Sequence, residues 1–440
     1  MSSVRKMCLF SLLAVGSVLA QTGAIQSTPV ENRPPTGVWV ILLDDANPVA
    51  FSHEWYRYGG AVTPNLDWLM KRGVLYPYGY VPHSTCRPAL STLHTGLPPE
   101  KHGATNNNRD VDIPSATAWG TVMKRLGYAT FLGGKWWEDT PPSEFGFDAT
   151  EGVGLQQAVP HPFVRDGQDA FLAMIATDRP WFAVWAPGLP HSPFDAPQEY
   201  LDRIDASAID VPSYVPVAQR GAYVQDQRRY LANLVRADDA VGEGLAVLAA
   251  TGTLDSTLIV VCSDNGWDYG GVSKQSPYER GVRTPIVYYW PEKIPPRVDT
   301  SVAALIDIPP TVVGLCGGKP HPLWSFDTSA SVLYTTPVRQ SYASSAYVLR
   351  PLTGNGGSPP ERTARWVRAD QWKLIRWERS ITPSMQPNLN WIYSYVSFPT
   401  RAAHTVELYN VWSDPLETTN VASAHPGVVG KLLTQLEASE

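Results

Sequence analysis

The sequence predicts an α/β protein with a mostly parallel central sheet flanked by helices, and with a small C-terminal antiparallel subdomain. Three observations support this fold class. Short, continuously apolar segments alternate with helical patterns, as in parallel sheets whose strands are connected by helices. Polar residues collect directly after the apolar segments, at the edge where open α/β sheets bind ligands. After about residue 320 the alternation ends, and short strand patterns with a hairpin follow.

The first element is the apolar run Val38–Leu43, which ends at Asp44-Asp45 and has the pattern of a buried strand. Gly133-Gly134-Lys135 closes a later strand, and Ser263-Asp264-Asn265 closes another. The remaining elements of this part are expected as a helix over 116–127, strands over 128–132 and 181–185, a long helix over 223–250, and strands over 258–262 and 285–289.

The C-terminal part has a different pattern. Residues 321–362 are rich in Pro, Ser and Thr and are expected to be irregular. A hairpin is predicted over 364–377 around Asp370, followed by a strand over 404–409 and a closing helix over 426–438. We therefore divide the chain into four parts: 1–20 as a signal peptide, 21–36 as a linker, 37–320 as the main domain and 321–440 as the C-terminal subdomain.

The N-terminus has the pattern of a secretory signal peptide. Two basic residues at 5–6 precede the apolar run Cys8–Leu19, and Ala20 offers a small-residue cleavage site. A membrane anchor is the alternative, but the run is shorter than the ~20 apolar residues that a spanning helix needs. We expect an exported protein, periplasmic or secreted, with no membrane span after cleavage.

Composition and cysteine content narrow the functional classes. The net charge of −6 and the absence of a basic stripe argue against nucleic-acid binding. Cleavage after Ala20 would leave Cys86, Cys262 and Cys316, an odd number that cannot pair completely. Cys262 and Cys316 have apolar neighbours and are expected in the core. Cys86 lies in a polar, proline-flanked segment that we expect to be a loop, so it is the candidate functional cysteine.

Asp44, Asp45, Asp264 and Asn265 are the candidate metal ligands, because they follow two predicted buried strands. Carboxylate and amide oxygens are hard ligands that suit Ca²⁺ or Mg²⁺ rather than zinc, and we expect Ca²⁺ ahead of Mg²⁺. Capping of a helix or turn explains either pair equally well when it is taken alone.

The segment 83–96 resembles the sulfatase family motif, Cys-x-Pro-x-Arg followed by four residues and Thr-Gly. Four positions match: Cys86, Pro88, Thr95 and Gly96. The arginine position holds Leu90 instead. In that family the cysteine is oxidised to formylglycine, whose hydrate is the nucleophile.

Further segments resemble sulfatase motifs in the family's order: Ile41–Asp45, Gly127–Trp136, Leu189–Pro193, Ser263–Gly266, Lys274–Pro285 and Glu407–Glu417. The resemblance covers about 37–425 and implies an alkaline-phosphatase-like fold, with 37–320 as a sulfatase-like catalytic domain. It implies hydrolysis of sulfate esters on a sulfated small molecule or glycan, and a formylglycine-generating enzyme as a partner. It also implies that residue 86 contacts the metal ion.

The resemblance assigns roles to three more residues. Lys135 and Lys274 would hold the sulfuryl oxygens, and His191 would protonate the departing alcohol oxygen. Without the resemblance, a lysine is usually placed on the surface. Lys135 follows Gly133-Gly134 at a strand end, which favours the site, whereas Lys274 rests mostly on the resemblance. The histidine alone would be placed in a packed loop between prolines.

Two departures fall on the nucleophile's side of the expected site. Leu90 stands at the arginine that supports formylglycine in the family, and Trp137 stands at a histidine that assists removal of sulfate. Arg87 and His94 are the candidates to replace them. Two alternatives therefore stay open: a phosphoester or phosphonate hydrolase on the same scaffold, and an inactive sulfatase-like protein that binds glycans.

Overall fold

The computed structural model describes residues 33–53, 63–107, 117–154, 175, 179–213, 215–267, 272–324, 332–333, 341–347, 362–382, 395 and 399–438. The expected signal peptide and most of the expected linker lie outside these residues. None of the helices in the described ranges has the length and apolar composition needed to cross a bilayer.

The larger sheet confirms the predicted fold class. Its strands are β1 (Gly37–Leu43), β2 (Val74–Tyr80), β3 (Ala129–Lys135), β4 (Ala149–Gly154), β5 (Trp181–Ala186), β6 (Thr257–Ser263), β7 (Arg283–Tyr289), β8 (Arg297–Val298) and β9 (Ala303–Ala304). Within the described residues they pair in the order β4-β3-β5-β1-β6-β7-β2-β8, with β9 on β2. All pairs are parallel except those that β7 makes with β6 and β2.

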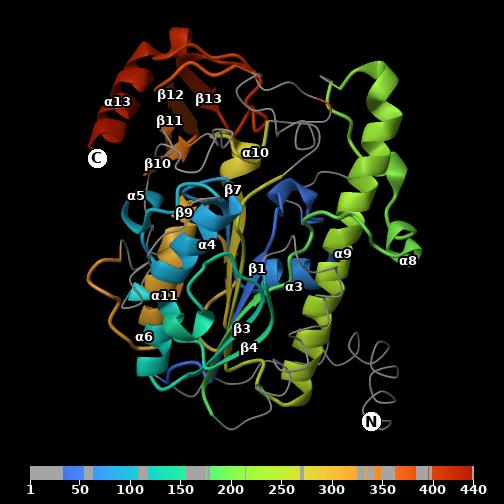
Figure 1. Ribbon diagram of the computed structural model, residues 1–440. Helices are drawn as coiled ribbons and strands as arrows, with labels where there is room; N and C mark the ends of the chain where they lie inside the picture. The colour runs from blue at the N-terminus through green and yellow to red at the C-terminus, as the bar shows by residue number, and fades with distance from the viewer. Residues whose placement is uncertain are drawn as a thin grey trace.

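Helices cover both faces of this sheet, as Figure 1 shows. The longer helical elements are α3 (Pro64–Arg72), α4 (Cys86–Thr95), α5 (Pro99–His102), α6 (Trp119–Arg125), α8 (Gln198–Leu201), α9 (Arg220–Ala250), α10 (Glu279–Val282), α11 (Ile308–Leu315) and α13 (Pro426–Glu437). Short 3-10 turns occupy Pro48–Ala50, Pro142–Phe145, Ala206–Ala208, Val217–Gln219, Leu305–Asp307 and Ala422–Ala424. Helices α4, α6 and α11 lie on one side of the sheet and α3 and α9 on the other, and α8 packs against α9.

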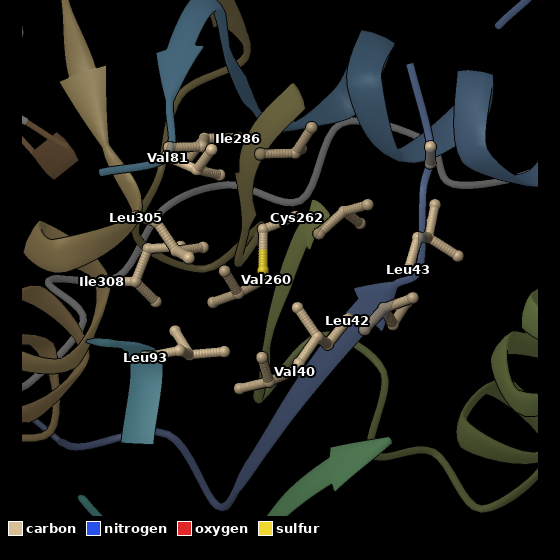
Figure 2. Packing of buried hydrophobic residues seen from close by; sticks show 14 of the residues in the cluster. Val40, Leu42, Leu43, Val81, Leu93, Val260, Cys262, Ile286, Leu305 and Ile308 are labelled. Atoms are coloured by element: carbon tan, nitrogen blue, oxygen red, sulfur yellow. The ribbon is translucent and has the colours of Figure 1, made fainter. Parts of the chain in front are cut away.

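β1 and β6 form the middle of the core (Figure 2). Their parallel register places Val40 opposite Val260 and Leu42 opposite Cys262. Because side chains alternate between the two faces of a strand, Val40, Leu42, Val260 and Cys262 share one face of the sheet. Leu93 of α4 packs against this face. The core position predicted for Cys262 is confirmed, since none of its surface is exposed. This packing fixes the carboxyl ends of β1 and β6 side by side.

A separate antiparallel sheet forms the predicted C-terminal subdomain. Its strands are β10 (Ser341–Tyr347), β11 (Arg362–Ala369), β12 (Trp372–Trp377) and β13 (Val406–Asn410), paired in that order. Helix α13 covers one face, where Leu432 and Leu436 pack with Leu374 and Leu408. The predicted hairpin around Asp370 and the closing helix are present. The division of the chain at residue 320 stays a prediction.

Strands β2, β4, β8, β9 and β10 were not predicted from the sequence, and for β10 and β2 the physical reason is clear. β10 lies within 321–362, which we expected to be irregular, so that expectation was wrong. Its sequence, SYASSAY, has no β-branched residue, and its pairing with β11 stabilises it instead. β2, with the sequence VLYPYGY, was not predicted because Pro77 and Gly79 interrupt the strand pattern. The register between Tyr76 and Gly79 is irregular for the same reason.

A buried group of charged side chains joins the second sheet to α10. The Nζ of Lys373 lies 3.1 Å from Glu279 Oε1 and 3.2 Å from Glu417 Oε1. The backbone N–H of Glu279 donates to Glu417 Oε2 (2.5 Å), and the hydroxyl of Tyr80 donates to Glu279 Oε2 (3.1 Å). Because α10 follows the segment that carries Lys274, these contacts tie the subdomain to a loop of the candidate site.

Candidate active site

Two pairs of polar residues lie together at the carboxyl ends of β1 and β6. Asp44 and Asp45 follow β1, and Asp264 and Asn265 follow its parallel neighbour β6. The backbone N–H of Asp45 donates to Asp264 Oδ1 (3.0 Å), and Asn265 Nδ2 donates to Asp45 Oδ1 (2.6 Å). The structure thus brings together the four side chains predicted as metal ligands, and all four are buried.

Two lysines bridge these carboxylates. Lys135 is the last residue of β3, and its Nζ lies 2.6 Å from Asp44 Oδ1 and 3.0 Å from Asp264 Oδ2. Lys274 lies between β6 and α10, and its Nζ is 2.7 Å from Asp45 Oδ1. Both lysines are buried, which excludes the surface location. When the three carboxylates and the two lysines are all ionised, the cluster has one negative charge in excess.

The backbone before Lys135 passes very close to β5. Gly134 has a φ of +92°, and a Cβ at this position would lie 2.0 Å from the carbonyl oxygen of Ala186. Only glycine combines this backbone conformation with such a close approach. The strand expected to end at residue 132 therefore continues to Lys135 and carries its side chain to the cluster.

Cys86 is the first residue of α4, so the expected loop position was wrong. The polar residues of α4 hid its helical pattern, because the helix is buried along its whole length. The Sγ of Cys86 lies 3.9 Å from Asp44 Oδ1. Ligand atoms of Asp44, Asp45, Cys86 and His191 all lie within 4.8 Å of one another. Residue 86 therefore faces the carboxylate cluster.

His191 contacts the cluster through Asp45. Its Nε2 lies 3.5 Å from Asp45 Oδ2, and its Nδ1 lies 2.7 Å from the carbonyl oxygen of Ser192. A proton on Nδ1 that is donated to this carbonyl leaves Nε2 unprotonated in the neutral ring. Asn233 of α9 holds the segment, because its Nδ2 donates to the carbonyl oxygens of His191 (3.3 Å) and Pro193 (3.1 Å).

Burial and the two lysines set the proton affinities of the cluster. Burial raises the pKa of Asp44 well above its usual range, and repulsion from Asp264 adds to the shift. Burial also opposes ionisation of Asp264, but the lysines outweigh it and lower the pKa of that carboxyl to about 2. Burial raises the pKa of the Cys86 thiol to about 12 and lowers the pKa of His191 to about 4. An unmodified Cys86 is therefore a protonated thiol near neutral pH, and a poor nucleophile.

The cluster fits a divalent cation. Asp44 Oδ2 and Asn265 Oδ1 are buried and accept no hydrogen bond from any group in the described part of the chain. A buried oxygen without a partner is destabilising, and a bound cation would satisfy both of these atoms. Carboxylate and amide oxygens are the ligands that Ca²⁺ and Mg²⁺ prefer.

Comparison with known proteins identifies the family of this chain. The Sulfatase family model matches residues 36–318, which is more than half of the chain. The chain belongs to the sulfatase family. This membership confirms the resemblance and the predicted enzyme class, a sulfuric ester hydrolase. The chain is 25% identical over 421 residues to the ulvan-active sulfatase of Formosa agariphila, covering 92% of this sulfatase and 78% of that protein.

Solved structures confirm the expected alkaline-phosphatase-like fold. One is a protein in complex with its substrate D-glucosamine-2-N,6-O-disulfate, with a TM-score of 0.72 and 18% identity over 92% of this chain and 97% of that chain. Another is the phosphonate monoester hydrolase of Silicibacter pomeroyi, with a TM-score of 0.71 and 19% identity over 92% of this chain and 94% of that chain. At these identities the likeness concerns the fold alone.

Neither departure from the family motif adds a polar group to the cluster of this sulfatase. Leu90 is buried in the apolar core. The ring centre of Trp137 lies 6.0 Å from Lys135 Nζ, so the indole packs beside the cluster. The ring of His94 lies 4.9 Å from that of Trp136 in an aromatic group, and neither of its nitrogens has a hydrogen-bond partner among the described residues. Arg87 forms ion pairs with two acidic residues that follow Trp137.

Sequence reasoning missed Ser84, which connects two loops of the site. The backbone N–H of Gln275 donates to the carbonyl oxygen of Ser84 (2.8 Å), and Ser84 Oγ donates to the carbonyl oxygen of Ser276 (2.7 Å). The segment before Cys86 is thereby held against the segment that carries Lys274. A serine in a polar stretch carries no signal in the sequence that would have pointed to this contact.

Proposed function

We propose that this sulfatase hydrolyses sulfate esters with a formylglycine formed from Cys86. The observation that carries the proposal is the position of Cys86, whose Sγ lies 3.9 Å from Asp44 Oδ1 and within the field of Lys135 and Lys274. As its hydrate, formylglycine would supply one hydroxyl to attack sulfur and displace the alcohol, and a second to expel sulfate and restore the aldehyde. The high pKa of the buried thiol argues against unmodified Cys86 as the nucleophile.

The two lysines are proposed to bind the sulfuryl oxygens. Lys135 and Lys274 are buried and reach the cluster from separate segments. Ammonium groups fixed in a buried site stabilise the negative charge that develops in sulfuryl transfer more strongly than they would in water. A bound sulfuryl group would compete with the carboxylates for these lysines, and a cation on the carboxylates would favour that exchange.

His191 is proposed to protonate the departing alcohol oxygen through Nε2. Its Nδ1 is engaged with the carbonyl oxygen of Ser192, so Nε2 is the nitrogen that faces the cluster. Burial keeps the free ring neutral near pH 7. A sulfate ester brings negative charge beside the ring, and this charge favours the protonated form that a general acid needs.

One divalent cation, Ca²⁺ ahead of Mg²⁺, is proposed to bind Asp44, Asp45, Asp264, Asn265 and the modified residue 86. The buried oxygens of Asp44 and Asn265 that lack hydrogen-bond partners within the described residues support this assignment. Ca²⁺ accepts sites built largely from protein oxygens, whereas Mg²⁺ usually keeps several waters. When bound, the cation supplies positive charge to the sulfuryl oxygens.

A sulfated small molecule or glycan is the proposed substrate class. The relative from Formosa agariphila is described as ulvan-active, and a protein of the same fold has a disulfated glucosamine as its substrate. Conversion of Cys86 would require a formylglycine-generating enzyme as a partner. We also propose that the protein is exported, periplasmic or secreted, as the N-terminal pattern predicts.

Two other functions have observations in their favour. The likeness in fold to a phosphonate monoester hydrolase supports phosphoester or phosphonate hydrolysis, since the same lysines and cation would suit a phosphoryl group. Leu90 and Trp137 favour an inactive glycan-binding protein, because both replace polar residues of the family motif.

Mass spectrometry of the peptide that contains residue 86, with release of sulfate measured on the same protein, tests the proposal. In a host with the modifying enzyme we expect at least partial conversion of Cys86, sulfate release, and no release by Cys86→Ala. Leu90→Arg should raise the converted fraction. Parallel assays with phosphate and phosphonate esters identify the second candidate. A fully retained thiol and no sulfate release would leave the binding-protein interpretation.

A further inference from the structure

A buried carboxylate joins the two segments in which this sulfatase departs from the family motif. Glu138 follows Trp137, and its side chain is only 2% exposed. Ser91 Oγ donates a hydrogen bond to Glu138 Oε1, and Arg87 Nε lies 3.7 Å from Glu138 Oε2. Arg87 and Ser91 are four residues apart in α4 and so share one face of the helix. Glu138 therefore contacts the first and second turns of the helix that begins with residue 86.

Arg87 has a second acidic partner that is exposed. Its Nη2 lies 2.8 Å from Asp139 Oδ2, and the side chain of Asp139 is 64% exposed. Water and salt screen such a pair, so it contributes little to stability. The pair with Glu138 lies in the interior, where a charged group without its partner is costly. Of the two acidic residues, Glu138 is the one that can hold α4.

Among the described residues, the first turn of α4 has few other side-chain contacts. Thr85, at the N-cap position, makes no side-chain hydrogen bond to the helix. The backbone N–H of Arg87 donates to Asn107 Oδ1 (3.0 Å). Leu90 is four residues after Cys86 and therefore lies beneath it on the same helix face, where an apolar side chain offers no hydrogen bond. Ser84 holds the segment that leads into the helix, and Arg87 and Ser91 hold the helix itself through Glu138.

We propose that Glu138 is a positioning residue, which holds the start of α4 through Arg87 and Ser91 and so sets the place of residue 86 relative to Lys135. Glu138 comes three residues after Lys135, the last residue of β3. Its carboxylate therefore connects α4, which begins with residue 86, to the end of the strand that places Lys135. This contact stands in for the polar residues that the family motif has at positions 90 and 137. The inference rests on the proposed sulfate ester hydrolysis.

The test compares Glu138→Ala and Glu138→Gln with Asp139→Asn as the matched control. Asp139→Asn removes the exposed partner of the same arginine and leaves the buried one. Turnover of 4-nitrophenyl sulfate is measured per formylglycine, which is counted by peptide mass spectrometry. We expect kcat of Glu138→Ala to fall roughly 100-fold, the size expected for a nucleophile displaced by about 1 Å. KM should stay nearly constant, because the lysines still bind the sulfuryl group.

Glu138→Gln keeps an acceptor for Ser91 and removes the charge that faces Arg87, so a smaller fall in kcat is expected. It also serves where Glu138→Ala does not fold. Asp139→Asn should retain wild-type kcat and KM. The inference is overturned by wild-type kcat in both Glu138 variants, by an equal loss in Asp139→Asn, or by a loss that appears only in KM.

Amide hydrogen exchange separates failure of this inference from failure of the proposed function. Should the wild-type protein hydrolyse no sulfate ester, the proposed function is wrong, and exchange over residues 86–95 still tests Glu138. Faster exchange in the first turn of α4 in Glu138→Gln, but not in Asp139→Asn, supports its role in holding the helix. Equal exchange in all three proteins overturns it.

Discussion

Removal of the divalent cation is expected to lower the thermal stability of this sulfatase. Without a cation, Asp44 Oδ2 and Asn265 Oδ1 are buried oxygens with no hydrogen-bond partner among the described residues. Each such atom costs about 1–3 kcal/mol, so the two together cost about 2–6 kcal/mol. In a protein of 440 residues, 1 kcal/mol changes Tm by about 1 °C. Chelation should therefore lower Tm by about 2–6 °C.

The assay is thermal unfolding of metal-analysed protein in buffer, in EDTA, and in EDTA saturated beforehand with Ca²⁺. The saturated chelator controls for effects of EDTA other than metal removal. Ca²⁺ should restore Tm at lower concentration than Mg²⁺, because a ligand stabilises the folded state according to its affinity. Asp264→Ala removes a ligand and should make Tm insensitive to EDTA. An unchanged Tm in EDTA, with no divalent ion found by metal analysis, would refute the assignment of the metal site.

The remaining predictions concern a glycine and a buried glutamate. Gly134→Ala should lower Tm and kcat much more than Gly127→Ala. Both glycines have a φ of +92°, but of the two only Gly134 would place a Cβ against backbone, 2.0 Å from the carbonyl oxygen of Ala186. Similar losses in the two variants would contradict the close approach. Burial, with repulsion from Glu279, raises the pKa of Glu417 to about 7 despite Lys373. At a pH between the unfolded pKa near 4.5 and the folded pKa of about 7, Glu417 is protonated in the folded state but ionised in the unfolded state. Its contribution to stability is therefore fully present below pH 4.5 and is lost as pH rises through about 7. The urea midpoint of the wild type should therefore fall from pH 5 to pH 8 by more than that of Glu417→Gln, and parallel curves would exclude this titration.

Much of the fold was predictable because apolar runs and their polar ends are local features of the sequence. β1 and β6 were recognised from short apolar segments, and parallel pairing then requires that Asp44 and Asp264 lie at one edge. The placement of Lys135 followed from the glycines before it. These predictions needed no knowledge of which strands are neighbours beyond the rule that the strands are parallel.

Features that depend on partners distant in the chain were not predictable. β10 has a weak strand sequence and forms because β11 pairs with it. Cys86 was placed in a loop because α4 buries polar side chains, and their partners, such as Glu138, lie far along the chain. The contact of Ser84 with Ser276 spans 192 residues, and neither serine differs in sequence from an ordinary loop residue.

The burial of Cys86 has a consequence for the order of events during biosynthesis. Only 1% of this residue is exposed, in the first turn of a helix that is itself buried, so no second enzyme can take the side chain into its own active site once the chain has folded. The proposed oxidation of the thiol would therefore have to precede folding of residues 83–96. Two rates would then compete: recognition of a motif that has leucine in place of arginine, and closure of the core around α4. This competition would set the yield of converted protein in a given host, and slower folding would raise it.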